Sequence, residues 1–308
     1  MAIYTNSNGK LRQVNESQFK LEKDIQKLVE ENLPILTNLQ FVKSEFIIKN
    51  KRIDTLAFDK QTDGFVIIEF KRDRNISVID QGFSYLSLML ENKAEFIIEY
   101  NESLNTNLKR DDIDWSQSRV VFVAPSFTDN QKLATNFKDV AIELWEIKKY
   151  ENNIISFNQI KKTSSQSIRQ VAKVGGEIEE VSKEIKVYNE EDLIMKGSQE
   201  IVELYESLKS RLLQLDDIEI SPTKIYIGFK LNTKIITDID IRKNSLKQRI
   251  NLKKGLLNDP KKLFYDVSEK GHWGAGDYEA VHNSEDVDID YIMSLVKQSY
   301  NFHRKNFS

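Results

Sequence analysis

The chain of 308 residues contains no cysteine and only three histidines. Without cysteine, the protein has no disulfides, no thiolate zinc sites and no cysteine nucleophile. The histidines, His272, His282 and His303, all lie toward the C-terminal end. A metal ion bound in the first half of the chain would therefore need oxygen ligands, which favours magnesium or manganese over zinc.

Long apolar runs are also missing. No stretch of about 18 apolar residues occurs, and the N-terminus lacks the apolar core of a signal peptide. We therefore expect a cytoplasmic protein that does not contact a membrane. A net charge of -3 provides no overall attraction to nucleic acid, so such binding would have to come from a local basic surface.

The content of 40% hydrophobic and 30% charged residues is typical of a globular protein, and 308 residues exceed a comfortable single core. We predict an α/β domain with a mixed sheet over residues 1–160. Residues 2–4 are expected to form a short edge strand. The predicted helices span 17–32, 77–91 and 128–137, and the predicted strands span 41–49, 52–59, 65–70, 94–100, 119–124, 140–147 and 154–157.

The second half differs in composition. Residues 161–188 are rich in Ser, Gln, Lys and Glu and predict a partly helical linker. Residues 189–308 predict a smaller α+β domain, which begins with a pattern resembling a capping box at Asn189 and Asp192. Its predicted helices span 189–213 and 288–302, and its predicted strands span 224–231, 234–241, 246–252 and 278–282.

Charged residues interrupt the most apolar strand of the first domain. Glu69 and Lys71 follow the apolar residues 65–68 and, being two apart, share one face of the strand. Because burial of a charge is costly, such a pair usually has partners or a function. Asp54 is expected on the neighbouring strand of the same hairpin. Two carboxylates and a lysine could together hold a divalent metal and activate water.

Hydrolysis of a phosphodiester needs a water deprotonated near neutral pH and positive charge near the phosphate. A magnesium ion bridged by Asp54 and Glu69, with the backbone carbonyl of Phe70 as a third oxygen, would supply both. Lys71 would orient the water or stabilise the pentacovalent state. Arg72 and Arg74 could hold flanking phosphates, or they could be ordinary solvated charges.

These residues resemble a known signature. Asp54 followed by Glu69-Phe70-Lys71 resembles the core of the PD-(D/E)xK nuclease superfamily, and Arg52-Ile53-Asp54 resembles its archaeal-type, mismatch-cleaving branch. Gln81 and Tyr85, four apart on the next helix, resemble the QxxxY motif of the RecB-like branch. The resemblance covers about residues 15–150 and agrees with the predicted αβββαβ order. Residues 190–305 resemble an uncharacterised C-terminal module found behind nuclease-like domains.

The resemblance implies a restriction-endonuclease-like fold and a Mg²⁺- or Mn²⁺-dependent deoxyribonuclease acting in repair or defence. Its partners would be DNA, a protein bound through the second domain, and a second copy of the chain in a homodimer. Glu22 is the best match for a glutamate on the preceding helix, with Glu30, Glu31 and Glu45 as alternatives. The implied site residues are Asp54, Glu69, Lys71, Gln81 and Tyr85 for catalysis, Glu22, Asp54, Glu69 and Phe70 for metal, and Arg52, Arg72 and Arg74 for substrate.

Other interpretations remain open at this stage. Glu69 and Lys71 could be a solvated ion pair, and Gln81 and Tyr85 an exposed helix pair. The acidic balance of the chain is compatible with a nuclease-fold module that binds nucleic acid without cutting it, or with a protein-interaction module. In the second domain, Lys247 and Arg249 belong either to a solvated sheet face or to a basic stripe along a phosphate backbone.

Overall fold

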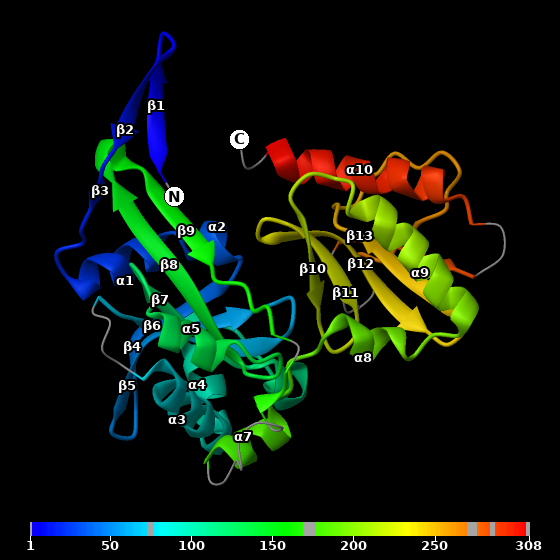
Figure 1. Cartoon of the computed structure of the whole chain (residues 1–308). Coiled ribbons are helices and arrows are strands. Elements are labelled where there is room, and N and C mark those ends of the chain that lie inside the picture. Colours follow the sequence, from blue (N-terminus) through cyan, green and yellow to red (C-terminus); the bar gives the residue numbers. More distant parts are fainter. Residues whose placement is uncertain are drawn as a thin grey trace. The chain divides into compact units, whose positions relative to one another are not determined.

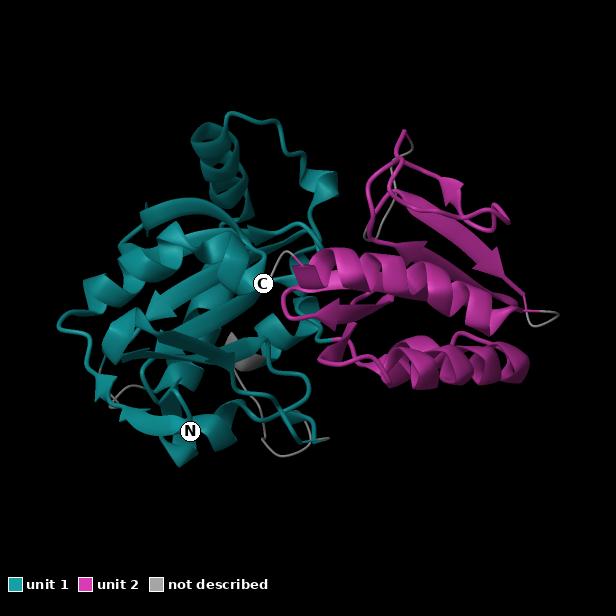
Figure 2. Ribbon diagram, turned by 90° about the horizontal axis from the view of Figure 1, so that it is seen from above, with its two compact units in different colours: residues 1–187 teal, residues 188–308 magenta. Residues whose placement is uncertain are grey.

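The computed structural model describes residues 2–72, 77–164, 166–168, 177–269, 276–283 and 287–305. It divides into two compact units, Met1–Val187 and Tyr188–Ser308, which are coloured separately in Figure 2. The α/β fold with a mixed sheet in the first unit and the α+β fold in the second are confirmed. No helix in the described ranges is both long and apolar enough to cross a membrane.

The first unit is built on a mixed sheet with the strand order β3-β8-β7-β6-β5-β4 (Figure 1). The meander of β4, β5 and β6 is antiparallel, whereas β6, β7 and β8 run parallel. Both β3 and β9 pair with β8 in the antiparallel sense. The strands are β3 (Glu16–Ser17), β4 (Gln40–Ile48), β5 (Lys51–Asp59), β6 (Gly64–Phe70), β7 (Arg119–Ala124), β8 (Ile142–Tyr150) and β9 (Ile155–Gln159).

Helices cover both faces of this sheet. One apolar cluster joins α1 and α2 to one face, and another joins α3, α4 and α7 to the opposite face. The helix α5 packs against α3 and β8. The bounds are α1 (Glu22–Glu31), α2 (Leu33–Thr37), α3 (Val78–Glu91), α4 (Lys93–Leu104), α5 (Asp129–Thr135) and α7 (Glu177–Glu184), with 3-10 helices η1 (Arg110–Asp112), η2 (Trp115–Gln117) and η3 (Glu151–Asn153).

The prediction of a strand over residues 94–100 was wrong, because this segment lies in α4. Phe96 and Tyr100 are buried one turn apart, whereas Ile98 between them is 54% exposed. The first helix also begins later than predicted, at Glu22, because Ser17 pairs with Lys149 of β8. A short apolar run is compatible with either structure, and here packing against β4 selects the helix.

The N-terminal residues were expected to form an edge strand and instead form a separate hairpin. Its strands are β1 (Ile3–Ser7) and β2 (Lys10–Val14), which pair only with each other among the described strands. Asn8 and Gly9 turn the chain with φ values of 49° and 80°. Positive φ at both positions is typical of a tight hairpin turn. Figure 1 shows the hairpin projecting from the first unit.

Of the segment expected to be a partly helical linker, the described residues 161–164, 166–168 and 177–187 are part of the first unit, and α7 supplies helix within it. Ile168, Val181 and Ile185 are buried in the same apolar cluster as α3. The backbone N–H of Lys186 donates to the carbonyl of Ser116 at 3.0 Å. Burial of these scattered apolar side chains explains why a polar composition was a poor guide to this segment.

The second unit is an antiparallel sheet with the strand order β10-β11-β12-β13-β15-β14. Its helices and its strands share one apolar cluster. The strands are β10 (Ile218–Pro222), β11 (Ile227–Leu231), β12 (Lys234–Arg242), β13 (Ser245–Ile250), β14 (Tyr265–Asp266) and β15 (Tyr278–His282), and the helices are α8 (Glu190–Ile194), α9 (Gln199–Leu212) and α10 (Ile289–Lys305).

The single helix predicted over residues 189–213 is divided into α8 and α9. The predicted capping box is present, since the side chain of Asn189 accepts from the N–H of Asp192 at 3.0 Å. After α8, the N–H of Ser198 donates to the carbonyl of Lys243 at 2.8 Å. A Cβ atom at Gly197 would lie 3.0 Å from a methyl group of Ile241, so the chain passes close to the sheet where the helix is interrupted.

Candidate functional site

The end of β6 carries a buried carboxylate. All seven residues of β6 are buried, and Glu69 is 5% exposed. Phe65 and Ile67 belong to the apolar cluster shared with α3, whereas Val66, Ile68 and Phe70 belong to the cluster shared with α1. The alternation of the strand therefore directs Glu69 toward α3. A solvated ion pair on a surface strand, one of the sequence-based alternatives, is not what the structure contains.

One oxygen of Glu69 has two donors and the other has none. Oε1 accepts from Lys71 Nζ at 2.7 Å and from Gln81 Nε2 at 2.8 Å. Oε2 is buried and has no hydrogen-bond partner, and the same is true of Gln81 Oε1. A buried carboxylate oxygen without a donor is costly, so these two atoms point to a ligand that would complete their interactions.

Asp54 lies beside this carboxylate. Its Oδ2 accepts from the backbone N–H of Phe70 at 3.0 Å. Burial, followed by the negative charge of Glu69, raises the pKa of Asp54 to about 6, although the Phe70 hydrogen bond and Lys71 oppose this shift. A carboxylate whose ionisation is disfavoured by burial and by a neighbouring negative charge is characteristic of a site that takes up a proton or a cation.

The helix α3 supplies two further polar groups. It begins after Ser77, whose side chain accepts from the N–H of Asp80, and Gln81 and Tyr85 follow one turn apart. Gln81 Nε2 also lies 3.3 Å from the Tyr85 hydroxyl, which donates to the carbonyl of Arg52 at 3.4 Å. Burial and the charge of Glu69 raise the pKa of Tyr85, so its hydroxyl stays protonated. Tyr85 is buried, which excludes an exposed helix pair.

The four glutamates considered for the preceding helix region have different surroundings. Glu22 accepts from the backbone N–H of Arg72 at 3.0 Å, and its charge contributes to the raised pKa of Asp54. Glu30 accepts from Thr55 Oγ1. Glu31 forms an exposed ion pair with Lys27, and Glu45 pairs with Arg52 at 3.1 Å. Of these four glutamates, Glu22 is the one whose charge affects the pKa of Asp54.

Sequence reasoning missed Gln26. This buried side chain on α1 donates to the backbone carbonyl of Asp54 at 2.9 Å, and its Nε2 also lies within hydrogen-bond distance of Ser44 Oγ and Glu30 Oε1. It thus ties α1 to the residue that carries the second carboxylate. Its position one turn after Glu22, on the apolar side of the helix, was the only signal in the sequence.

The arginines predicted to contact substrate are not equivalent. Arg52 is paired with Glu45, as described above, and the guanidinium of Arg72 donates to the carbonyl of Lys20 at 2.9 Å. Arg74 lies outside the described residues. Of the three, Arg72 also lines a pocket at the end of the sheet.

Which cation the site suits can be judged from its donors. Within the described ranges, no group of three or more His, Cys, Asp or Glu side chains is arranged to hold a metal ion. The available oxygens are those of Asp54, the unpaired Oε2 of Glu69 and backbone carbonyls at the end of β6. Magnesium is commonly bound by one or two carboxylates while it keeps several waters, so this donor set fits it.

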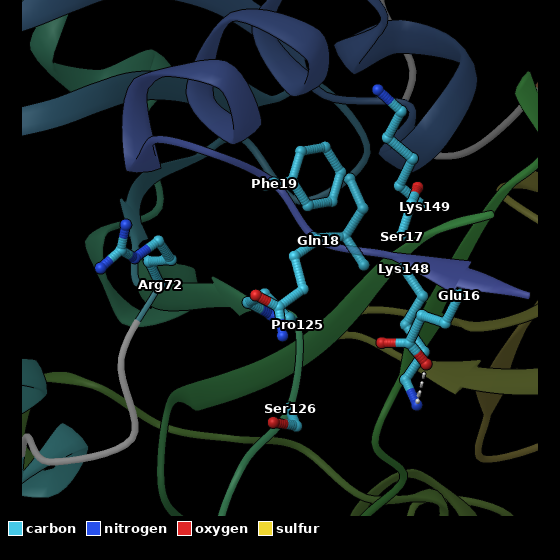
Figure 3. A pocket seen from close by; sticks show the side chains of 10 residues that line it. Glu16, Ser17, Gln18, Phe19, Arg72, Pro125, Ser126, Lys148 and Lys149 are labelled. Carbon is cyan, nitrogen blue, oxygen red and sulfur yellow. Dashed lines mark ion pairs between the residues drawn. The ribbon is translucent and has the colours of Figure 1, made fainter. Parts of the chain in front are cut away.

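A pocket of about 940 Å³ opens at the carboxyl ends of β6 and β7. We call it the strand-end pocket. It lies between the loop after β7, the late part of β8 and the segment that contains β3 (Figure 3). In open α/β sheets, ligands bind outside the carboxyl ends of the strands. Its lining residues are Glu16, Ser17, Gln18, Phe19, Arg72, Pro125, Ser126, Ile147, Lys148 and Lys149.

The second unit contains a buried row of charges. Asp238, Arg249 and Glu279 lie opposite one another on β12, β13 and β15. Arg249 bonds Asp238 at 2.6 Å and Glu279 at 3.2 Å, and Lys247 pairs with Glu279 at 2.6 Å. Lys247 and Arg249 are therefore neither a solvated face nor a basic stripe available to phosphates.

Comparison with known sequences finds one relative along nearly the whole chain and one family model over the second unit. A protein of Haemophilus influenzae described as an uncharacterized protein is 53% identical over 301 residues, which is 97% of this chain and 99% of that protein. A family model described as a domain of unknown function, DUF5655, matches residues 190–303.

Solved structures resemble the chain only in part. EndoMS in complex with double-stranded DNA is 20% identical, with a TM-score of 0.27 over 40% of this chain and 44% of that chain. A repair endonuclease from Pyrococcus abyssi is 21% identical, with a TM-score of 0.23 over 39% and 44%. SfsA from Pyrococcus furiosus in complex with Ca²⁺ is 15% identical, with a TM-score of 0.25 over 51% and 75%. Likenesses at these TM-scores carry no conclusion about function.

Proposed function

We propose that this chain, which belongs to the same family as the Haemophilus influenzae protein, is a metal-dependent nuclease that hydrolyses phosphodiester bonds of DNA. The proposed site consists of Asp54, Glu69 and Lys71, with Gln81 and Tyr85 behind them, as in the PD-(D/E)xK superfamily that the sequence resembles. One observation carries the proposal: Glu69 is buried with Oε1 held by two donors and Oε2 held by none, beside a second carboxylate.

Asp54 and Glu69 would hold Mg²⁺ or Mn²⁺, with the Phe70 carbonyl as a further oxygen donor. Glu22, the fourth ligand expected from the resemblance, would act on the ion through its charge rather than by direct contact. Such an ion would supply positive charge near the phosphate and lower the pKa of water. The raised pKa of Asp54 near 6 means that its carboxyl changes charge close to neutral pH. At pH 7 most copies of the protein therefore carry Asp54 as a carboxylate, and binding of a cation there displaces few protons.

Lys71 is the group proposed to act on the reacting atoms. Its ammonium is held at 2.7 Å by Glu69 Oε1, which fixes where its remaining N–H donors can point. A positioned cation of this kind stabilises charge as it develops on a phosphate oxygen. Gln81 shares the same carboxylate oxygen and so fixes the carboxylate as well. The hydroxyl of Tyr85 accepts a hydrogen bond from Gln81 Nε2 at 3.3 Å and so helps to fix the Gln81 side chain.

The test is cleavage of a panel of linear, circular, single-stranded, forked and mismatched DNA, together with RNA, in magnesium, manganese or EDTA. Wild type is compared with Asp54→Asn and Lys71→Ala, and with Lys183→Gln as a control on an exposed lysine of α7. We expect cleavage that needs metal and falls by about 100-fold or more in both site variants. Metal-independent cleavage, or unchanged cleavage in Lys71→Ala, would refute the assignment.

A second candidate is a nuclease-fold module that binds nucleic acid without cutting it. The observation in its favour is that no three acidic or histidine side chains converge on one metal position in the described part of the chain. Binding that weakens with salt, combined with no metal-dependent product on any substrate in the panel, would favour this candidate. Selection of the substrate or of a protein partner by the second unit, a homodimer, and a role in repair or defence are further proposals from the resemblance.

A further inference from the structure

We infer that the strand-end pocket binds an unpaired DNA strand beside the proposed cleavage site. This inference rests on the proposed function and names the form of the substrate. The pocket begins at Arg72, the residue directly after Lys71. The N–H of Lys71 donates to the carbonyl of Val123 at 2.9 Å, so the end of β6 and the loop after β7 are held side by side. Phe19 and Ile147 of the pocket belong to the apolar cluster on the α1 face of the sheet, whereas Glu69 faces α3. A strand that reaches both the site and the pocket would therefore cross the carboxyl end of β6.

The size of the pocket favours an unpaired strand. At about 940 Å³ it lies at the upper end of the range for small-ligand sites, which suits a segment of a few nucleotides. Duplex DNA is much wider, since its major groove alone measures about 12 Å across. A duplex could lie over the pocket but could not enter it.

The charges of the pocket suit a phosphate backbone. Its lining has three basic side chains, Arg72, Lys148 and Lys149, and one acidic side chain, Glu16. Glu16 is paired with Lys148 at 3.5 Å. Lys149 is exposed and forms no ion pair with a residue in the described ranges. In a chain with a net charge of -3, this is a local excess of positive charge.

Phe19 adds a surface on which a base can stack. It is half-buried against the apolar cluster of α1, and Figure 3 shows its ring between Arg72 and the strand that carries Lys148 and Lys149. Proteins that hold unpaired strands combine basic grooves with aromatic side chains of this kind. The segment that carries Phe19 is fixed to the sheet, because Glu16 and Ser17 pair with Tyr150 and Lys149 of β8.

The experiment measures binding in EDTA, so that cleavage does not interfere. Fluorescence anisotropy is recorded with a labelled short DNA single strand, a blunt duplex of the same sequence and the corresponding RNA single strand. The variants are Lys149→Gln, Phe19→Leu, which keeps an apolar side chain against the cluster, and Lys183→Gln as the control. Thermal unfolding of each variant verifies that it is folded.

We expect Phe19→Leu to weaken binding of the DNA single strand by roughly fivefold or more, with little effect on the duplex. In Lys149→Gln, the slope of log affinity against log salt should fall by about 0.7, the value for one phosphate contact on a single strand. Lys183→Gln should bind like wild type. Tighter binding of RNA than of DNA, or equal losses for single strand and duplex, would overturn the inference.

The two proposals fail separately. If metal-dependent cleavage is observed but Phe19→Leu and Lys149→Gln bind the single strand like wild type, the inference is wrong and the nuclease assignment stands. If no substrate is cleaved but both variants lose single-strand binding, the pocket has the inferred role and the nuclease assignment fails.

Discussion

The carboxylate of Asp54 accepts a hydrogen bond from the backbone N–H of Phe70 at 3.0 Å, although the two residues are 16 positions apart. The antiparallel register of β5 and β6, in which Thr55 lies opposite Ile68, brings them together. The same register places Asp54 beside Glu69, whose charge helps to raise its pKa. The strand register therefore produces both the hydrogen bond to Phe70 and the proximity of the two carboxylates.

Asp54→Asn should stabilise the protein at neutral pH. The folded-state pKa of about 6 lies above the unfolded value near 3.8, so the stability of wild type falls as pH rises from about 4 to 6. The amide oxygen of asparagine can still accept from Phe70 but does not titrate. We expect a gain of about 1 kcal/mol above pH 6, moderated by partial exposure, and none below pH 4. Urea unfolding across this range measures it, and a pH-independent difference would contradict the prediction.

Magnesium or manganese should raise the unfolding temperature of wild type. A ligand that binds only the folded state stabilises it by about 2.7 kcal/mol at a concentration 100 times its Kd. We expect this rise to disappear in Glu69→Gln and Asp54→Asn, because the proposed oxygen donors are neutralised. Glu31→Gln is the control, since Glu31 is exposed and paired with Lys27. An equal rise in Glu69→Gln would place any bound metal elsewhere.

Gln81→Leu should reduce cleavage more than Tyr85→Phe. Gln81 donates to Glu69 directly, whereas the hydroxyl of Tyr85 contacts Gln81. Residues that orient a metal ligand typically contribute about 10- to 100-fold in affinity or activity. Single-turnover cleavage rates test the order, with Ser87→Ala as the control because Ser87 bonds Glu91 at an exposed position. The reverse order of the two variants would refute the proposed arrangement.

Gln26→Leu should destabilise the first unit. In wild type, Gln26 Nε2 donates both to the carbonyl of Asp54 and to the carboxylate of Glu30, and the substitution removes this donor. Loss of a buried hydrogen-bond partner costs about 1–3 kcal/mol. Denaturant unfolding measures this loss, and Lys27→Gln, the exposed neighbour on α1, should change stability by much less. Equal stabilities for the two variants would show that the Gln26 contacts do not contribute.

Arg249→Met should strongly destabilise the second unit. Arg249 is almost fully buried and bonds both Asp238 and Glu279, so its removal takes the guanidinium away from two buried carboxylates. Glu279 keeps Lys247 and the hydroxyl of Tyr265 as partners. Breaking such a pair costs about 3–5 kcal/mol. The loss should appear in denaturant unfolding, whereas Lys297→Gln at an exposed position of α10 should unfold like wild type. A loss below 1 kcal/mol would mean that the row is not held by its charges.

Much of the α/β arrangement could be predicted from the chain itself. The meander β4–β6, the helix α3 and the parallel strands β7 and β8 follow periodic patterns that depend on nearby residues. The segment predicted as a strand, which forms α4, and the described part of the segment predicted as a linker, which includes α7, have apolar residues whose partners lie far away in the chain. Their structure depends on packing, which local periodicity does not encode.

The sequence by itself determined that Glu69 and Lys71 share a face of an apolar strand and that no cysteine takes part in any site. Only the tertiary structure decided the donors of Glu69, the unpaired Oε2, the contact of Gln26 with Asp54 and the pairing of Arg249. The alternation of a strand is a property of consecutive residues, whereas hydrogen-bond partners depend on strand register and helix docking across long separations in the chain.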